Sequence, residues 1–214
     1  RNSTKDAKEL FDSGLAAKII AKSHEIPVVG ICGGYQILGN IIYDDDKKES
    51  DVGTIEGLKL LDIESKFQRT EKIVTQSEAV MPEKEDLTGI AGAIFAKIAG
   101  EKVTGYEIHE GTSHLNPSKE VNPLLNVQKG QGNNDEGNFD GACSGNVFGT
   151  YFHGIFHNYN FRREFLNYLR VRKGIEAKNG EDPYETQKDY SLNKLAQIVE
   201  ENIDMEIIDE LIFS

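Results

Sequence analysis

A cysteine flanked by glycines follows a short apolar run and carries the clearest chemical signal in the chain. The run Val28–Ile31 is rich in β-branched residues, and Cys32-Gly33-Gly34 leads directly into Tyr35–Leu38. This pattern predicts a buried strand, a tight turn and a helix, the arrangement of a nucleophile elbow. A helix N-terminus stabilises a thiolate, and the backbone N–H after the cysteine can bind an oxyanion. We therefore predict that Cys32 is an activated nucleophile, although a lone cysteine at a strand end is more often a small core residue.

A nucleophilic cysteine needs a base, and the chain contains five histidines. His153 follows the predicted strand Asn146–Phe152, so it can project from the edge of a sheet into a cleft. His24 lies at the opposite end of the Cys32 strand, and His157 is expected on the surface. Position alone favours His153 without excluding the others.

The other elements must bring these two side chains together. We predict an α/β fold with a domain over residues 1–173, followed by a connector and helical tail over 174–214. A charged stretch, Asp44–Glu49, is interpreted as a solvated loop. The predicted elements are a helix from about Asp6 to Ile20 capped by Ser3 or Thr4, a strand at Lys102–His109, a hairpin turning near 130–137, an amphipathic helix at Phe161–Arg172, and two tail helices at about Ser191–Asn202 and Met205–Leu211.

The composition is globular and argues against several classes of partner. The chain has 36 acidic and 24 basic side chains, a formal net charge of −12, which disfavours nucleic acid and anionic membranes. No apolar run approaches the ~20 residues that span a bilayer. The polar start does not resemble a signal peptide, so we expect a cytoplasmic location. Cys32 and Cys143 are expected to be free thiols, and no Cys/His cluster has metal-site spacing.

Several stretches, taken together, resemble a known family. They look like class I (triad-type) glutamine amidotransferases and, more narrowly, the C-terminal amidotransferase domain of the cobyric acid synthases. The likeness covers residues 1 to about 172 and implies a flavodoxin-like mixed or parallel sheet with flanking helices, its N-terminal strands missing. The matching segments follow the family order and are 30–39, 57–64, 105–111, 145–156 and 161–166.

The resemblance implies roles for individual residues. Cys32 would attack the glutamine carboxamide, and His153 would shuttle the proton. Gly33 would allow the substrate to approach closely, and Gln36 matches a position that lines the glutamine site in related enzymes. Two further residues of a family motif near the active site, Tyr106 and His109, are also candidates for substrate binding. For Gln36 a position on the helix surface is the alternative, and for His109 a structural hydrogen-bonded role.

Two features depart from the general family pattern. Most triad amidotransferases carry a carboxylate two residues after the histidine, where this chain has Ile155. The cobyric acid synthase branch lacks it too, and Glu107 or a backbone carbonyl could orient His153 instead. The second departure is the start of the chain, because the glycine that resembles a second oxyanion donor would fall just before Arg1. The fragment could therefore hydrolyse glutamine poorly.

The resemblance also implies a larger enzyme around this domain. Glutamine would be the ammonia source, and a synthetase domain in cis, with ATP and Mg, would amidate carboxylates of the corrinoid adenosylcobyrinic acid a,c-diamide. No phosphate-binding loop occurs in this chain, so no cofactor is expected within it. The alternatives are the amidotransferase domain of a cobyrinate a,c-diamide synthase or of a lipid II amidating enzyme, a cysteine hydrolase of another substrate, or a catalytically incomplete scaffold.

Overall fold

The start of the chain forms two helices where the sequence predicts one. In the computed structural model, which describes residues 2–67, 72–116, 121–134 and 136–213, these are α1 (Ser3–Asp12) and α2 (Leu15–Ser23). Gly14 between them has a φ of +73°, a left-handed conformation that glycine adopts without strain. The single helix predicted from Asp6 to Ile20 is therefore wrong, because the apolar spacing continues across a break in the backbone.

The loop after the second strand holds the start of α1. The predicted cap is wrong, since Asn2 rather than Ser3 or Thr4 accepts a backbone hydrogen bond from the first turn. The prediction that residues 44–49 form a solvated loop is confirmed for residues 45–48, which are exposed, but is wrong for the first residue. Asp44 is fully buried and accepts hydrogen bonds from the backbone N–H groups of residues 48–50. Glu49 in turn accepts a hydrogen bond from the backbone of Ser3, so this loop clamps the helix.

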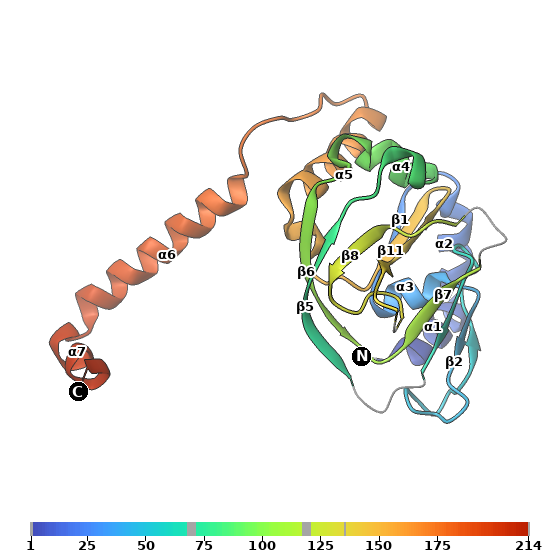
Figure 1. The fold of residues 1–214 in the computed structure, drawn as a ribbon, viewed down its shortest axis with the longest axis horizontal. Helices are drawn as coiled ribbons and strands as arrows, with labels where there is room; N and C mark the ends of the chain where they lie inside the picture. Colours follow the sequence, from blue (N-terminus) through green and yellow to red (C-terminus); the bar gives the residue numbers. More distant parts are fainter. Residues whose placement is uncertain (1, 68–71, 117–120, 135, 214) are drawn as a thin grey trace. The chain divides into compact units, whose positions relative to one another are not determined.

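A small sheet places the predicted nucleophile next to the predicted base. β1 (Val28–Ile31) pairs in parallel with β11 (Val147–Thr150), whose other edge pairs with β10 (Ala142–Ser144). Cys32 follows β1 directly and His153 comes shortly after β11. Because the carboxyl ends of parallel strands meet at one edge of a sheet, both residues lie at the same end. Figure 1 shows β1 and β11 side by side, with α3 (Gly33–Leu38) next to them.

The other strands form two mostly antiparallel sheets in the described part of the chain. One has the order β3-β2-β4-β7 and the other β6-β5-β8-β9, in which β5 and β6 pair over eight residues. The strand β6 (Lys102–His109) has the predicted bounds, and β8 with β9 confirms the predicted hairpin. The remaining strands are β2 (Ile41–Tyr43), β3 (Ile55–Glu56), β4 (Ile63–Lys66), β5 (Ile73–Val80), β7 (Thr112–Leu115), β8 (Leu125–Lys129) and β9 (Phe139–Asp140).

Two apolar clusters stabilise this unit. One contains the stacked rings of Phe95 and Phe161, against which Phe148 of β11 packs edge-on. The other surrounds Tyr35 of α3 and Tyr151. The α/β class predicted from the sequence is confirmed. The helices around the clusters are α4 (Gly89–Phe95) and α5 (Tyr159–Arg172), with short 3-10 turns η1 (Lys84–Asp86), η2 (Ala96–Ile98) and η3 (Ile155–His157).

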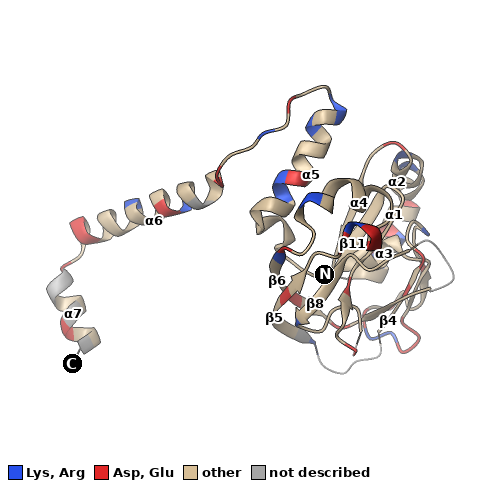
Figure 2. Ribbon diagram, turned by 45° about the horizontal axis from the view of Figure 1, so that its top comes forward, with Lys and Arg blue, Asp and Glu red and all other residues tan. Residues whose placement is uncertain are grey.

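Contacts divide the chain into the units Arg1–Ala177 and Lys178–Ser214. The second unit contains α6 (Pro183–Asn202) and α7 (Met205–Phe213), so the predicted helical tail is present. α6 begins earlier than predicted, because Pro183 occupies its first turn and Asp182 caps it. Among the described residues no helix combines the length and apolarity needed to cross a membrane. Figure 2 shows acidic and basic residues interspersed along the ribbon.

Candidate active site

Cys32 forms the turn between β1 and α3 in a backbone conformation that side chains rarely adopt. Its φ is +54° and its ψ is −116°, and it is one of three non-glycine residues with positive φ among those described. Its backbone N–H donates to the carbonyl of Thr150, 2.9 Å away. A Cβ on Gly30 would lie 2.6 Å from Leu38 and 2.8 Å from the backbone of Gly34. Glycine at position 30 therefore lets the strand and helix approach closely enough to make this elbow.

A cavity of about 1070 Å³ opens at the elbow. Cys32, Gly33 and His153 line it, together with Tyr106 and Ile108 of β6. The Cys32 thiol donates to the carbonyl oxygen of Ile108, 3.5 Å away. The structure thus brings the nucleophile and the base of the sequence prediction to one cavity, and places β6 along its wall.

His153 contacts Tyr106 both through its backbone and through its imidazole ring. Its backbone N–H donates to the Tyr106 carbonyl at 2.9 Å, and its carbonyl accepts from the Tyr106 N–H at 3.1 Å. The two rings stack with centroids 5.1 Å apart and planes 13° apart. His153 Nε2 is buried and has no hydrogen-bond partner among the described residues. Burial, helped by the positive charges of His109 and Lys72, lowers the pKa of His153, which favours the neutral ring that a general base requires.

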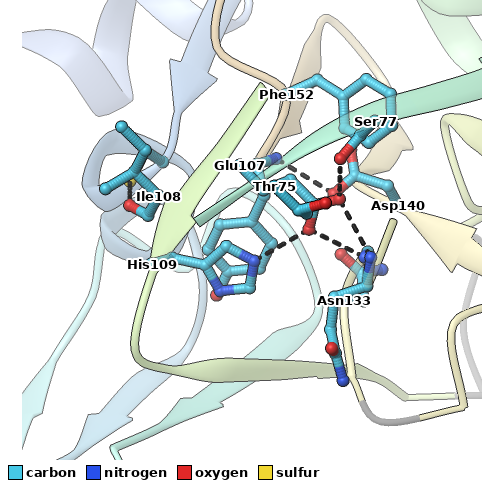
Figure 3. A network of polar contacts seen from close by, with 12 residues as sticks. Thr75, Ser77, Glu107, Ile108, His109, Asn133, Asp140 and Phe152 are labelled. Carbon is cyan, nitrogen blue, oxygen red and sulfur yellow. Dashed lines mark hydrogen bonds and ion pairs between the residues drawn. The ribbon is translucent and has the colours of Figure 1, made fainter. Parts of the chain in front are cut away.

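Glu107 is fully buried and forms a polar network with His109 (Figure 3). One carboxylate oxygen accepts from Ser77 and from the backbone N–H of Gln131. The other accepts from the backbone N–H of Gly132 at 2.9 Å and lies 3.0 Å from His109 Nε2. Burial raises the pKa of Glu107, but the bonds from His109, Ser77 and Gln131 outweigh it and lower that pKa overall. The suggestion that Glu107 orients His153 is therefore wrong, because its oxygens bind these groups instead.

His109 is buried between Glu107 and the end of β6. Its Nδ1 lies 2.8 Å from the carbonyl oxygen of Gly111, which can only accept a hydrogen bond. His109 therefore lies between the carboxylate of Glu107 and a backbone carbonyl, each within hydrogen-bonding distance of one ring nitrogen. Tyr106 and Ile108 line the cavity, whereas Glu107 and His109 point to the other side of the strand. Figure 3 shows Ile108 on the side of β6 opposite to Glu107 and His109.

Gln36 lies beneath the elbow and is 2% exposed. Its amide oxygen accepts from the Ser3 hydroxyl at 2.7 Å, and its amide nitrogen donates to the Tyr151 hydroxyl at 3.1 Å. The His109 ring stacks on Tyr151 with centroids 3.9 Å apart. The structure therefore places Gln36 and His109 in a layer behind the cavity, which neither of them lines.

Sequence reasoning did not single out Tyr151 or Asp140. Asp140 is fully buried and accepts hydrogen bonds from the Thr150 hydroxyl and from the backbone N–H of Tyr151. Burial raises the pKa of Asp140 to about 7, and the negative charge of Glu107 adds to the shift. Its glycine- and asparagine-rich surroundings are typical of a loop, so no local pattern indicated a buried acid. Cys143 is also buried, and both cysteines are free thiols.

Comparisons with known proteins agree with this geometry. The model of the CobB/CobQ-like glutamine amidotransferase domain matches residues 1–161. Similar curated proteins are a "Probable cobyric acid synthase" of Methanothermobacter thermautotrophicus, 47% identical over 213 residues, and one of Methanosphaera stadtmanae, 44% identical over 213 residues. A "Cobyric acid synthase" of Clostridium botulinum is 40% identical over 214 residues. Each alignment covers 99% of this chain and 40% of the relative, so the chain spans about two fifths of their length.

A solved structure of a glutamine amidotransferase aligns with 81% of this chain and 75% of its own, at a TM-score of 0.46 and 15% identity. That likeness is too low to establish the fold by itself. The family match covers three quarters of the chain and includes both the elbow and His153. The chain belongs to the CobB/CobQ-like glutamine amidotransferase domain family.

Proposed function

We propose that Cys32 and His153 release ammonia from glutamine. His153 takes the thiol proton of Cys32, and Sγ attacks the carboxamide carbon while the Gly33 N–H binds the developing oxyanion. The tetrahedral adduct expels ammonia, which takes the proton from His153, and leaves a γ-glutamyl thioester on Cys32. Water, deprotonated by His153, hydrolyses the thioester and regenerates the thiol. Glutamine and water are thereby converted to glutamate and ammonia.

The observation that carries this proposal is that a cysteine with a strained backbone and a histidine line the same cavity. Lowering of the His153 pKa by burial favours the proton-accepting form. The family match supports glutamine as the substrate. Tyr106 lines the same cavity, whereas Gln36 and His109 support its wall from behind.

We propose in addition that the ammonia is used by an amide-forming enzyme of the cobyric acid synthase type. The names of the similar relatives support this assignment over a cobyrinate a,c-diamide synthase or a lipid II amidating enzyme. The acceptor would be a corrinoid carboxylate, and a synthetase domain in cis would use ATP and Mg. A cytoplasmic location belongs to the same proposal, and it agrees with the lack of a disulfide between Cys32 and Cys143.

Replacement of each cysteine separates catalysis from structure. We expect Cys32→Ala to abolish glutamate release while ammonia-dependent amidation by the natural full-length polypeptide persists. Cys143→Ala is the matched control, because this buried thiol lies outside the cavity. The substitution should change the rate of glutamate release by less than about threefold. A glutamine analogue with an electrophilic carbon should label Cys32, as mass spectrometry of the digested protein would show. Labelling of Cys143, or glutamate release by Cys32→Ala, would contradict the proposal.

A further inference from the structure

The base of this site lacks the usual means of fixing its orientation. In Ser-His-Asp sites a carboxylate accepts a hydrogen bond from the histidine and sets the plane of the ring. Here Ile155 occupies the position two residues after His153, and Glu107 binds other groups. His153 Nε2 has no hydrogen-bond partner among the described residues. Among the described residues, the contact that the structure gives to the imidazole is with an aromatic ring.

Tyr106 provides that contact. Its ring lies almost parallel to the imidazole, at 13°, with the centroids 5.1 Å apart. The same two residues exchange a pair of backbone hydrogen bonds, which fix the distance between their Cα atoms. A ring packed on one face of the imidazole favours the orientation in which the two planes stay nearly parallel. The hydroxyl of Tyr106 makes no hydrogen bond to another described residue, so the aromatic face is the part in contact.

The strand that carries Tyr106 is itself held firmly. β6 pairs with β5 along its whole length. On its opposite side Glu107 accepts backbone hydrogen bonds from Gln131 and Gly132 and contacts His109 (Figure 3). Tyr106 itself is 44% exposed, but Glu107 and His109 of the same strand are buried and hold the strand in place.

We propose that Tyr106 is the positioning residue of His153, and that its stacked ring fixes the plane of the imidazole in place of a carboxylate. This inference rests on the proposed function, because it assigns a role within the Cys32–His153 pair. It differs from direct contact with glutamine, the role suggested by the sequence, since it acts on the base rather than on the substrate. The ring, and not the hydroxyl, is the part required.

Two substitutions separate the ring from the hydroxyl in the natural full-length polypeptide. Tyr106→Phe retains the stacked ring and should keep kcat for glutamate release within about twofold, with KM unchanged. Tyr106→Leu removes it and should lower kcat about 10- to 100-fold, the loss expected when a reacting group is misaligned. Tyr190→Leu removes an exposed tyrosine of α6 and is the matched control, with activity unchanged.

The pH profile gives a readout that a merely structural role would not move. Loss of the Tyr106 ring admits water to His153, so its pKa should rise toward the ordinary value and the acidic limb of kcat/KM should move to higher pH. A higher KM with unchanged kcat in both Tyr106 variants would overturn the proposal in favour of glutamine contact. Wild-type activity in Tyr106→Leu would also overturn it.

A measurement without turnover distinguishes failure of this inference from failure of the proposed function. The His153 imidazole can be titrated by NMR in wild type and in Tyr106→Leu, with His153→Ala used to assign its signal. A higher pKa and a broader distribution of ring orientations in the variant support positioning, and identical titration curves refute it. If folded wild-type protein released no glutamate while this titration shifted as expected, the glutaminase assignment alone would fail.

Discussion

At the scale of single residues, Cys32 has an unusual backbone conformation and His153 has an unusual environment. Cys32 has a positive φ that is tolerated because Gly30 allows β1 and α3 to approach closely. His153 has a buried Nε2 and a lowered pKa, because solvent is excluded and positive charges lie nearby. Strained backbones and shifted pKa values are typical of functional sites rather than of ordinary surface positions.

His153→Ala tests the general base. We expect kcat/KM for glutamate release to fall by about 10²–10⁴-fold, as is typical when a general base is removed. The folded state should remain intact, because the side chain makes no hydrogen bond through Nε2 to a described residue. His114→Ala, at an exposed position of β7, is the control. A loss below about threefold would exclude His153 from this role.

At the scale of elements, β6 has two faces with different tasks. Tyr106 and Ile108 line the cavity, and Glu107 and His109 make buried polar contacts on the other side. The alternation of side chains along a strand therefore puts the residues that line the cavity on one face and the residues that support the strand on the other. The 44–50 loop supports the other wall, because it holds the start of α1.

Asp44→Ala tests the support given by this loop. Backbone N–H groups of residues 48–50 would lose their acceptor, so we expect the free energy of unfolding to fall by about 1–3 kcal/mol. Urea unfolding followed by circular dichroism measures the change. Asp46→Ala, at an exposed position of the same loop, should change stability by less than about 0.5 kcal/mol. Equal effects of the two substitutions would show that the burial of Asp44 is unimportant.

At the scale of the whole molecule, a buried acid ties stability to pH. Burial raises the pKa of the Asp140 carboxyl from 3.8 to about 7. Between these values the folded protein binds more protons than the unfolded chain. The contribution of Asp140 to stability is therefore fully present below the unfolded pKa and is lost as the pH rises through about 7. Glu107 acts in the opposite sense, because its pKa is lowered and its contribution is lost in acid.

Asp140→Asn removes this dependence. We expect the stability of the variant relative to wild type to improve steadily from about pH 4 to about pH 7. In this range the Asp140 carboxyl of wild type ionises in the unfolded chain but stays protonated in the folded protein, so wild type loses stability as the pH rises. Urea unfolding at several pH values measures the difference. Asp46→Asn should run parallel to wild type at every pH. A constant difference between Asp140→Asn and wild type would show that Asp140 does not titrate in this range.

Local patterns were sufficient for some parts of the molecule and not for others. Lys102–His109 and Phe161–Arg172 show strong periodicity, and β6 and α5 closely follow those bounds. The apolar spacing predicted one helix across Gly14, whereas the structure has two helices with Gly14 between them. The prediction was also wrong at Asp44, because a charged residue is expected in water unless backbone N–H groups surround it, and the local sequence does not show that.

The sequence by itself determined the elbow, since β-branched residues, a cysteine and glycines in that order have few other interpretations, and it indicated His153 as the base. Only the tertiary structure shows that the Tyr106 ring stacks on His153, the contact from which we propose that Tyr106 orients the imidazole. Tyr106 and His153 are far apart in sequence, and their stacking depends on the register of β6 against the segment after β11. The same holds for Gln36, which touches Ser3 and Tyr151 through the packing of distant elements. Local periodicity specifies strands and turns, whereas such contacts arise only once the strands are paired.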